Sequence, residues 1–350
     1  MTGVAPAPVV SAAMVQEAAE RITGRARRTP VIDWSVRAEG SRVEVTLKLE
    51  LLQHVGSFKP RGAFNRILSA PALPELVVAA SGGNHGLAVA YAARELGIRA
   101  AVYVPVTAPK VKVDGIRGLG AATVLVGNSY ADAAEASYER AGEPGALYVH
   151  PYDQNEVVAG QGTVGLELDQ QAPELTTVLV ATGGGGLIGG IAAWFGRRAQ
   201  GVSVEPHGSP TMYAALAAGA PVDVEVGGLA SDALGARRIG VHGFLSAQAA
   251  NVKAVLVSEA AIVEARRLLW DDLRVAAEPG GATALAALLE GAYRPSPSER
   301  VAVVVCGGNA DPCDLVVAGT DLRSPQARRP PADGPAPRGV RRAKGELRAS

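Results

Sequence analysis

Residues 56–63 read Gly-Ser-Phe-Lys-Pro-Arg-Gly-Ala, and this stretch decides how the rest of the chain is interpreted. Its lysine, Lys59, is one of only six lysines among 34 basic residues, so the other basic positions are arginine. A guanidinium stays protonated, whereas a lysine amine can lose its proton and attack a carbonyl carbon. A lone lysine in a loop is usually a solvated surface residue. The residues that flank Lys59 instead favour a reactive amine.

Three glycine-rich turns follow this segment, each directly after a short apolar run. They are Ser-Gly-Gly-Asn-His-Gly at residues 81–86, four glycines at 183–186, and Cys-Gly-Gly-Asn at 306–309. In open α/β sheets, ligands bind at the carboxyl ends of the strands. We therefore expect all three turns to open onto one crevice. Glycines before a helix let a phosphate approach the free N–H groups at the helix N-terminus.

The turn at 183–186 leaves two interpretations open. Gly184, Gly186 and Gly189 also satisfy the dinucleotide-binding fingerprint, and Glu205 ends the next apolar run about 20 residues further on. This segment alone is equally compatible with a nicotinamide- or flavin-binding fold. Lys59 and Asn84 favour the other interpretation, because a Rossmann oxidoreductase needs neither. Both interpretations place an anionic phosphate on the same turn.

In their order along the chain, these four segments resemble those of the fold-type II pyridoxal-phosphate enzymes. Within that group they are most similar to the threonine/serine dehydratase and serine racemase family, over roughly residues 15–320. The resemblance implies an α/β, tryptophan synthase β-like fold of parallel twisted sheets flanked by helices. It also implies a large pyridoxal-phosphate-binding domain from residues 1–71 and 152–322, and a small domain from residues 72–151.

The resemblance further implies a role for each site residue. Lys59 would hold pyridoxal 5'-phosphate through its amine and remove the Cα proton as general base, and Ser81 would bind the substrate carboxylate. The other residues implied to bind the cofactor are Phe58, Asn84, Gly183, Gly184, Gly185, Gly186, Glu278 and Cys306. Asn84 would contact the 3-hydroxyl of the cofactor, the glycines its phosphate, and Cys306 the neighbourhood of the pyridine nitrogen.

The implied activity is that of an ammonia-lyase. It would convert a β-hydroxy-α-amino acid such as L-threonine or L-serine to a 2-oxo acid and ammonia. A thiol at Cys306 would not protonate the ring nitrogen as an aspartate would, which favours loss of the β-hydroxyl. Racemases of this family carry serine where Gly82 stands, so we expect little racemization. The alternatives are a β-replacement synthase or racemase on the same fold, a Rossmann nicotinamide oxidoreductase, or a non-catalytic binding protein.

Composition narrows the classes of partner. The formal net charge is zero, which argues against nucleic acids and membrane surfaces as partners. The N-terminus does not read as a signal peptide, no apolar run approaches about 18 residues, and the chain has two cysteines, so we expect a cytoplasmic location. We expect an amino acid as substrate, a homodimer or higher homo-oligomer, and no metal. The basic, Pro- and Arg-rich tail at 323–350 is expected to be disordered.

Short apolar runs alternate with amphipathic stretches along the chain, which predicts parallel sheets flanked by helices. The predicted strands are 45–49, 76–80, 101–104, 122–126, 178–181, 202–205, 254–257 and 301–306. The predicted helices are 11–22, 85–96, 129–141, 187–198, 259–272 and 281–290, the first of them capped by Ser11.

Overall fold

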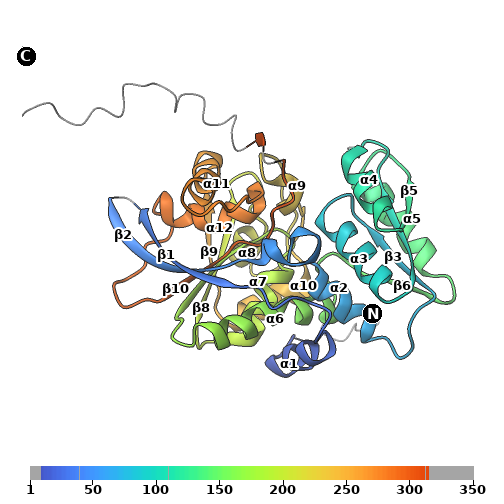
Figure 1. Ribbon diagram of the computed structural model, residues 1–350, viewed down its shortest axis with the longest axis horizontal. Helices are drawn as coiled ribbons and strands as arrows, with labels where there is room; N and C mark the ends of the chain where they lie inside the picture. Colours follow the sequence, from blue (N-terminus) through green and yellow to red (C-terminus); the bar gives the residue numbers. More distant parts are fainter. Residues whose placement is uncertain (1–8, 39, 109, 312, 315–350) are drawn as a thin grey trace, which may run out of the picture.

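The computed structural model describes residues 9–38, 40–108, 110–311 and 313–314. The basic tail predicted at 323–350 therefore lies outside the described residues. The described chain forms two β-sheets, each covered by helices, which lie side by side in Figure 1.

The larger sheet has six strands within the described residues, in the spatial order β1-β2-β10-β7-β8-β9. These strands are β1 (Val31–Ala38), β2 (Ser41–Lys48), β7 (Thr177–Ala181), β8 (Gln200–Pro206), β9 (Lys253–Val257) and β10 (Val301–Val304). β1 and β2 form an antiparallel hairpin, and every other neighbouring pair is parallel. The central strands β7 and β10 are wholly buried, as expected for a parallel sheet that is covered on both faces.

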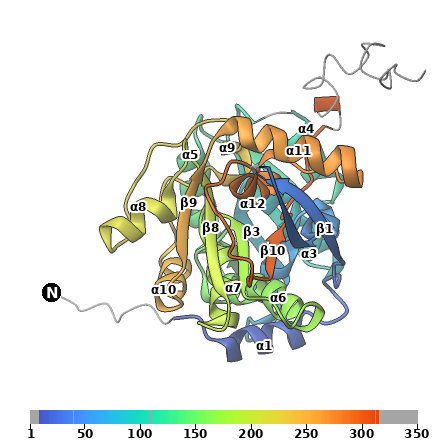
Figure 2. The same ribbon diagram turned by 90° about the vertical axis from the view of Figure 1, so that its left-hand side faces the viewer.

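Helices cover both faces of this sheet. In Figure 2, α6, α7 and α10 lie below the strands, while α11 and α12 lie above them. The helices of this part are α1 (Ala12–Arg21), α2 (Pro60–Leu68), α6 (Asn155–Gln171), α7 (Gly186–Phe195), α8 (Thr211–Ala218), α9 (Ser231–Leu234), α10 (Val241–Ala249), α11 (Glu259–Leu273) and α12 (Pro279–Leu289). Two 3₁₀ turns, η1 (Glu50–Leu52) and η2 (His54–Gly56), lead from β2 to the lysine segment.

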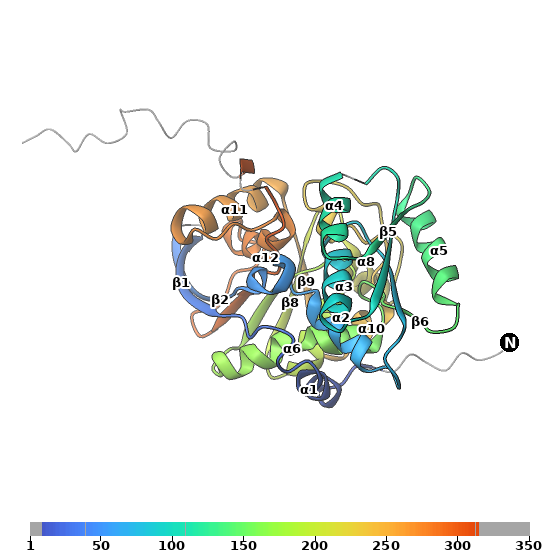
Figure 3. The same ribbon diagram turned by 45° about the vertical axis from the view of Figure 1, so that its right-hand side comes forward.

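The smaller sheet is entirely parallel, in the order β5-β4-β3-β6. Its strands are β3 (Leu76–Ala80), β4 (Arg99–Val104), β5 (Ala122–Leu125) and β6 (Ala146–Tyr148), and its helices are α3 (Asn84–Glu95), α4 (Lys110–Gly118) and α5 (Tyr130–Ala141). Figure 3 shows α3 and α4 on one face of this sheet and α5 on the other.

The predicted strands and helices are all present, with ends that differ by a few residues at most. Ser11 caps α1 as predicted, since its hydroxyl accepts from Met14 N at 3.3 Å. The sequence prediction missed the strands β1 and β6 and the helices α2, α4, α6, α8, α9 and α10. β1 reads Val-Ile-Asp-Trp-Ser-Val-Arg-Ala, which has charged and polar residues between its apolar ones, and β6 has only three residues. Neither forms the continuous apolar run by which the other strands were recognised.

Candidate active site

The lysine segment is held against the end of β10. An isolated β-bridge joins Ser57 to Gly307, and Phe58 N donates to Cys306 O at 3.2 Å. Two residues later Pro60 begins α2, where its fixed φ suits the first turn of a helix. The chain therefore turns from an extended bridge into a helix at Lys59, which directs the Lys59 side chain into the interior.

The Lys59 amine lies in a cavity, where among the described residues it has one hydrogen-bond partner, the carbonyl oxygen of Pro151 at 2.8 Å. The amine also lies 5.1 Å from the centre of the Phe58 ring. Burial lowers the pKa of Lys59 to about 8, although Cys306 and Glu278 favour its charged form. A substantial fraction of the amine is therefore uncharged near neutral pH, as a nucleophile or a general base requires.

The glycine turn at 183–186 faces the same cavity. Gly185 has φ +84°, a conformation that favours glycine, and it directly precedes α7. A Cβ at Gly184 would lie 2.2 Å from the Tyr152 ring, so packing also requires glycine there. Within the described part of the chain, the N–H groups of Gly183, Gly184 and Gly185 have no hydrogen-bond acceptor. Three free donors before a helix N-terminus form an anion site.

The first and third glycine-rich turns meet through their asparagines. Asn309 donates to Asn84 Oδ1 at 2.8 Å, and Asn84 Nδ2 donates to Glu278 Oε1 at 2.7 Å. Burial raises the pKa of Glu278 to about 7, although the hydrogen bond from Asn84 favours the charged form. The turns that follow β3, β7 and β10 therefore share one cavity, as the sequence predicted, even though β3 belongs to the other sheet.

Cys306 forms a neutral part of the cavity wall. Its thiol is buried and lies 3.6 Å from the carbonyl oxygen of Gly280, and burial raises the pKa of the thiol well above its usual value. His85, in the first turn, hydrogen-bonds the carbonyl oxygen of Val149 at 2.8 Å, and burial lowers its pKa to about 3. His85 therefore stays neutral and has a packing role.

Nine of the ten predicted site residues line this cavity, and Ser81 does not. The Ser81 hydroxyl accepts from Gly83 N at 3.1 Å and stabilises the turn that begins α3. The cavity is also lined by residues that the sequence prediction missed, namely Pro151, Tyr152, Gln161, Ala181, Thr182, Leu187, Ile188, Ala233 and Leu234. Pro151 and Gln161 lie in His-Pro at 150–151 and Ala-Gly-Gln-Gly-Thr at 159–163, two stretches that also resemble the family, so a signal for them existed. Ala233 and Leu234 lie on the four-residue helix α9, which carries no motif.

A buried charge network supports the lysine segment from behind. Arg61, two residues after Lys59, binds Glu50 and Glu167, each at 2.7 Å, and Lys48 binds Glu167 at 2.6 Å. Burial alone would lower the pKa of Arg61, but the two carboxylates raise it above its usual value. These four residues, the paired cluster, connect β2, the start of α2 and α6. The backbone that carries Lys59 is thereby fixed.

These residues fit pyridoxal 5'-phosphate. The three free glycine N–H donors suit a phosphate, and Lys59 offers the amine with which the aldehyde of the cofactor reacts. Phe58, Asn84 and Cys306 provide apolar and neutral polar walls between these two ends. Among the described residues, no group of three or more His, Cys, Asp or Glu side chains could hold a metal ion.

Comparison with known proteins supports this fit. A family model described as "Pyridoxal-phosphate dependent enzyme" matches residues 22–307. An L-threonine ammonia-lyase of Geobacter sulfurreducens is 37% identical over 303 residues, which are 85% of this chain and 75% of that protein. The structure of maize serine racemase matches with TM-score 0.82 and 31% identity, over 89% of this chain and 97% of that one. The structure of a T.th. threonine deaminase matches with TM-score 0.78 and 34% identity, over 86% and 99%.

Proposed function

The chain belongs to the pyridoxal-phosphate-dependent enzyme family, and on that premise we propose that it is an ammonia-lyase for a small β-hydroxy-α-amino acid. The substrate class is L-threonine or L-serine, and the products are a 2-oxo acid and ammonia. The observation that carries the proposal is the buried Lys59 amine, which shares a cavity with the anion site at 183–186. The similarity to the Geobacter sulfurreducens ammonia-lyase supports the choice of reaction.

The cavity contains residues that would bind the cofactor and an amine, that of Lys59, that would transfer a proton. When bound, the cofactor supplies an electron-accepting ring that makes the Cα proton of an amino acid acidic. Gly183, Gly184 and Gly185 would hold its phosphate, and Lys59 would carry it covalently. Once released, the Lys59 amine can accept the Cα proton at Nζ, because its pKa is lowered to about 8.

The walls of the cavity favour elimination. The Cys306 thiol is neutral, so it adds no charge that would hold a proton on the cofactor ring. Ser81 and the turn that it stabilises would receive the substrate carboxylate, although the Ser81 side chain lies outside the cavity itself. Asn84 is oriented by Asn309 on one side and Glu278 on the other, so its position beside the cofactor is fixed before binding.

A serine racemase is the second candidate, because the fold matches the maize serine racemase. Racemization needs an acid on the face of the Cα carbanion opposite Lys59. Gly82 offers no side chain there, and a Cβ built on it would lie 3.6 Å from Val104 and 3.8 Å from Ala108, so a serine would fit. We therefore expect Gly82 to limit racemization. After incubation with L-serine, D-serine formed as fast as pyruvate would favour the racemase.

The direct test is Lys59→Ala, with Lys253→Ala as control because Lys253 is an exposed lysine on β9. We expect keto-acid release from L-threonine and L-serine to fall about a thousandfold or more in Lys59→Ala and to be unchanged in Lys253→Ala. Borohydride reduction followed by peptide mass mapping gives a second measurement. Cofactor mass should appear on the peptide that contains Lys59, and cofactor attached to another lysine would contradict the proposal.

Three further proposals concern the whole protein. The limits of the two domains are proposed at residues 71/72 and 151/152, which is supported by the restriction of β3–β6 to residues 76–148. A cytoplasmic location is supported by the two free cysteines. A homo-oligomer remains a prediction, to be tested by sedimentation. No helix among the described residues has the length and apolarity to cross a membrane.

A further inference from the structure

Glu205 is a buried carboxyl group that has no role in the proposed reaction. It lies near the end of β8 with none of its surface exposed. The elements packed on β8 are β7, β9, α7, α8 and α12, and they contribute two titratable side chains. Lys253 lies at the opposite end of β9, paired with Val202, and Tyr213 lies on α8 with its phenol half-exposed. In the described structure, Glu205 forms no salt bridge.

The hydrogen bonds around Glu205 connect it to the start of α8 and, through Thr211, to the glycine turn. Met212 N donates to Oε1 at 2.7 Å and Tyr213 N to Oε2 at 2.8 Å, so the carboxyl group caps α8. The Thr211 hydroxyl lies 2.9 Å from Glu205 Oε1 and 2.6 Å from the carbonyl oxygen of Gly183. A hydroxyl has one proton and can satisfy only one of these two acceptors. If Glu205 is ionised, Thr211 can donate its proton to Glu205 Oε1 or to Gly183 O. The other of these two oxygens then receives no hydrogen bond from Thr211.

A protonated Glu205 satisfies every one of these contacts. The carboxylic O–H then donates to Thr211, and the Thr211 O–H donates to Gly183 O. This relay ends on the first residue of the glycine turn, whose N–H groups form the anion site. In the ionised state, Thr211 turns toward the carboxylate, Gly183 O loses its donor, and a buried negative charge lies behind a site for phosphate.

We propose that Glu205 is a positioning residue whose proton, relayed through Thr211, fixes the glycine turn in the geometry that binds the cofactor phosphate. Burial raises the pKa of Glu205 to about 7, although the hydrogen bonds from Met212, Tyr213 and Thr211 favour its charged form. This pKa determines how binding of the cofactor phosphate should depend on pH. The neutral form predominates below this pKa and supports binding. As pH rises through about 7, the proton is lost and affinity for the phosphate falls. This inference rests on the proposed cofactor.

The test measures binding without catalysis. The full-length apo protein is titrated by calorimetry with 4'-deoxypyridoxine 5'-phosphate, which lacks the aldehyde and cannot react with Lys59, in EDTA from pH 6 to 9. Glu205→Gln is neutral at every pH: its amide can donate to Thr211 and its oxygen can accept from Tyr213 N, while the bond from Met212 N is lost equally at all pH values. Above pH about 7 we expect the ratio of wild-type to Glu205→Gln affinity to fall, by up to about tenfold per pH unit.

Two variants and one stability measurement complete the design. Glu225→Gln changes an exposed glutamate and should follow the wild type at every pH. Thr211→Val keeps the side-chain shape and removes the relay, so it should bind more weakly than the wild type at pH 6.5. The melting temperature of the apo protein should decline from pH 6 to 8.5 in the wild type more steeply than in Glu205→Gln, and this measurement involves no ligand.

The outcomes separate this inference from the proposed function. Failure of the analogue to bind at any pH would contradict the cofactor assignment. Binding with parallel pH curves for the wild type and Glu205→Gln would overturn only the role of Glu205. If Glu205→Gln does not fold, Thr211→Val decides, because undiminished affinity in that variant at pH 6.5 would exclude the relay.

Discussion

Among the described residues, one set of carboxyl groups with little exposed surface is paired with cations, and another set is not. Glu50 and Glu167 belong to the paired cluster, where Arg61 and Lys48 balance their charge and the pKa of Glu167 is lowered, since the two cations outweigh its burial. Glu205 and Glu278 form no salt bridge among the described residues, and burial raises the pKa of each to about 7. Glu167 and Glu205 are both largely buried, so the cations beside Glu167 account for the opposite directions of their pKa shifts.

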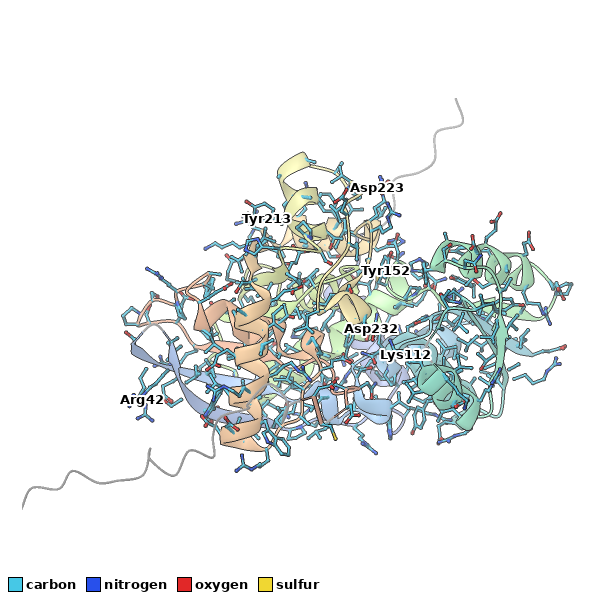
Figure 4. All side chains as sticks on the ribbon, turned by 90° about the horizontal axis from the view of Figure 1, so that it is seen from above. Arg42, Lys112, Tyr152, Tyr213, Asp223 and Asp232 are labelled. Carbon is cyan, nitrogen blue, oxygen red and sulfur yellow. The ribbon has the colours of Figure 1, made fainter. Side chains whose placement is uncertain are left out.

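The difference in pairing agrees with the different roles of the two sets of carboxyl groups. The paired cluster fixes the backbone around Lys59, and its salt bridges give strong, directional contacts there. The unpaired carboxyl groups lie beside the glycine turn and the cofactor cavity, where a fixed negative charge would oppose a phosphate. Figure 4 shows a third situation, the exposed pair of Lys112 and Asp232, which joins α4 to α9 across the two parts of the molecule.

The largest effect is expected from Arg61→Met, which removes one cation from the paired cluster. One buried negative charge would then lack a partner, and breaking a buried pair typically costs about 3–5 kcal/mol. The free energy of unfolding from urea titration measures this loss. Arg42→Met is the control, since Arg42 lies at the exposed tip of β2 beside Glu44, and it should change stability by less than about 0.5 kcal/mol. A loss below about 1 kcal/mol in Arg61→Met would show that the network is not needed for stability.

An intermediate effect is expected from Glu278→Gln. Because the pKa of Glu278 is raised to about 7, its neutral form favours the folded state fully below the unfolded pKa, and this contribution is lost as pH rises through about 7. The wild-type apo protein should therefore lose about 1–3 kcal/mol more stability between pH 5 and 8 than Glu278→Gln. The comparison is made by urea titration at each pH. Equal losses in both proteins would show that Glu278 is ionised throughout.

The smallest effect is expected from Lys112→Ala. The side chains of Lys112 and Asp232 are 27% and 68% exposed, and exposed ion pairs contribute about 0–1 kcal/mol. The loss should be below about 0.5 kcal/mol and should vanish in 0.5 M salt. Lys110→Ala, on the same helix, is the control, because Lys110 pairs with Asp114 within α4 and does not reach α9. A salt-independent loss above about 2 kcal/mol would show that the contact holds α4 and α9 together.

The sequence predicted the fold class because its strands and helices are strongly patterned. β3 and β7 are largely apolar runs that are followed by glycine-rich turns, and Ser11 caps its helix as predicted. β1 was missed because its polar residues alternate with apolar ones in a hairpin at the sheet edge. The short helix α9 was missed because four residues show no periodicity.

The sequence by itself predicted which residues form the candidate site. Lys59, the glycine turn and Asn84 lie in motifs whose local composition admits few other uses. Only the tertiary structure decided the protonation states. The partners of Arg61 come from positions 50 and 167, and the proton on Glu205 depends on Thr211 and on the carbonyl group of Gly183. A pKa depends on burial and on contacts between residues far apart in the chain, and no local pattern records these.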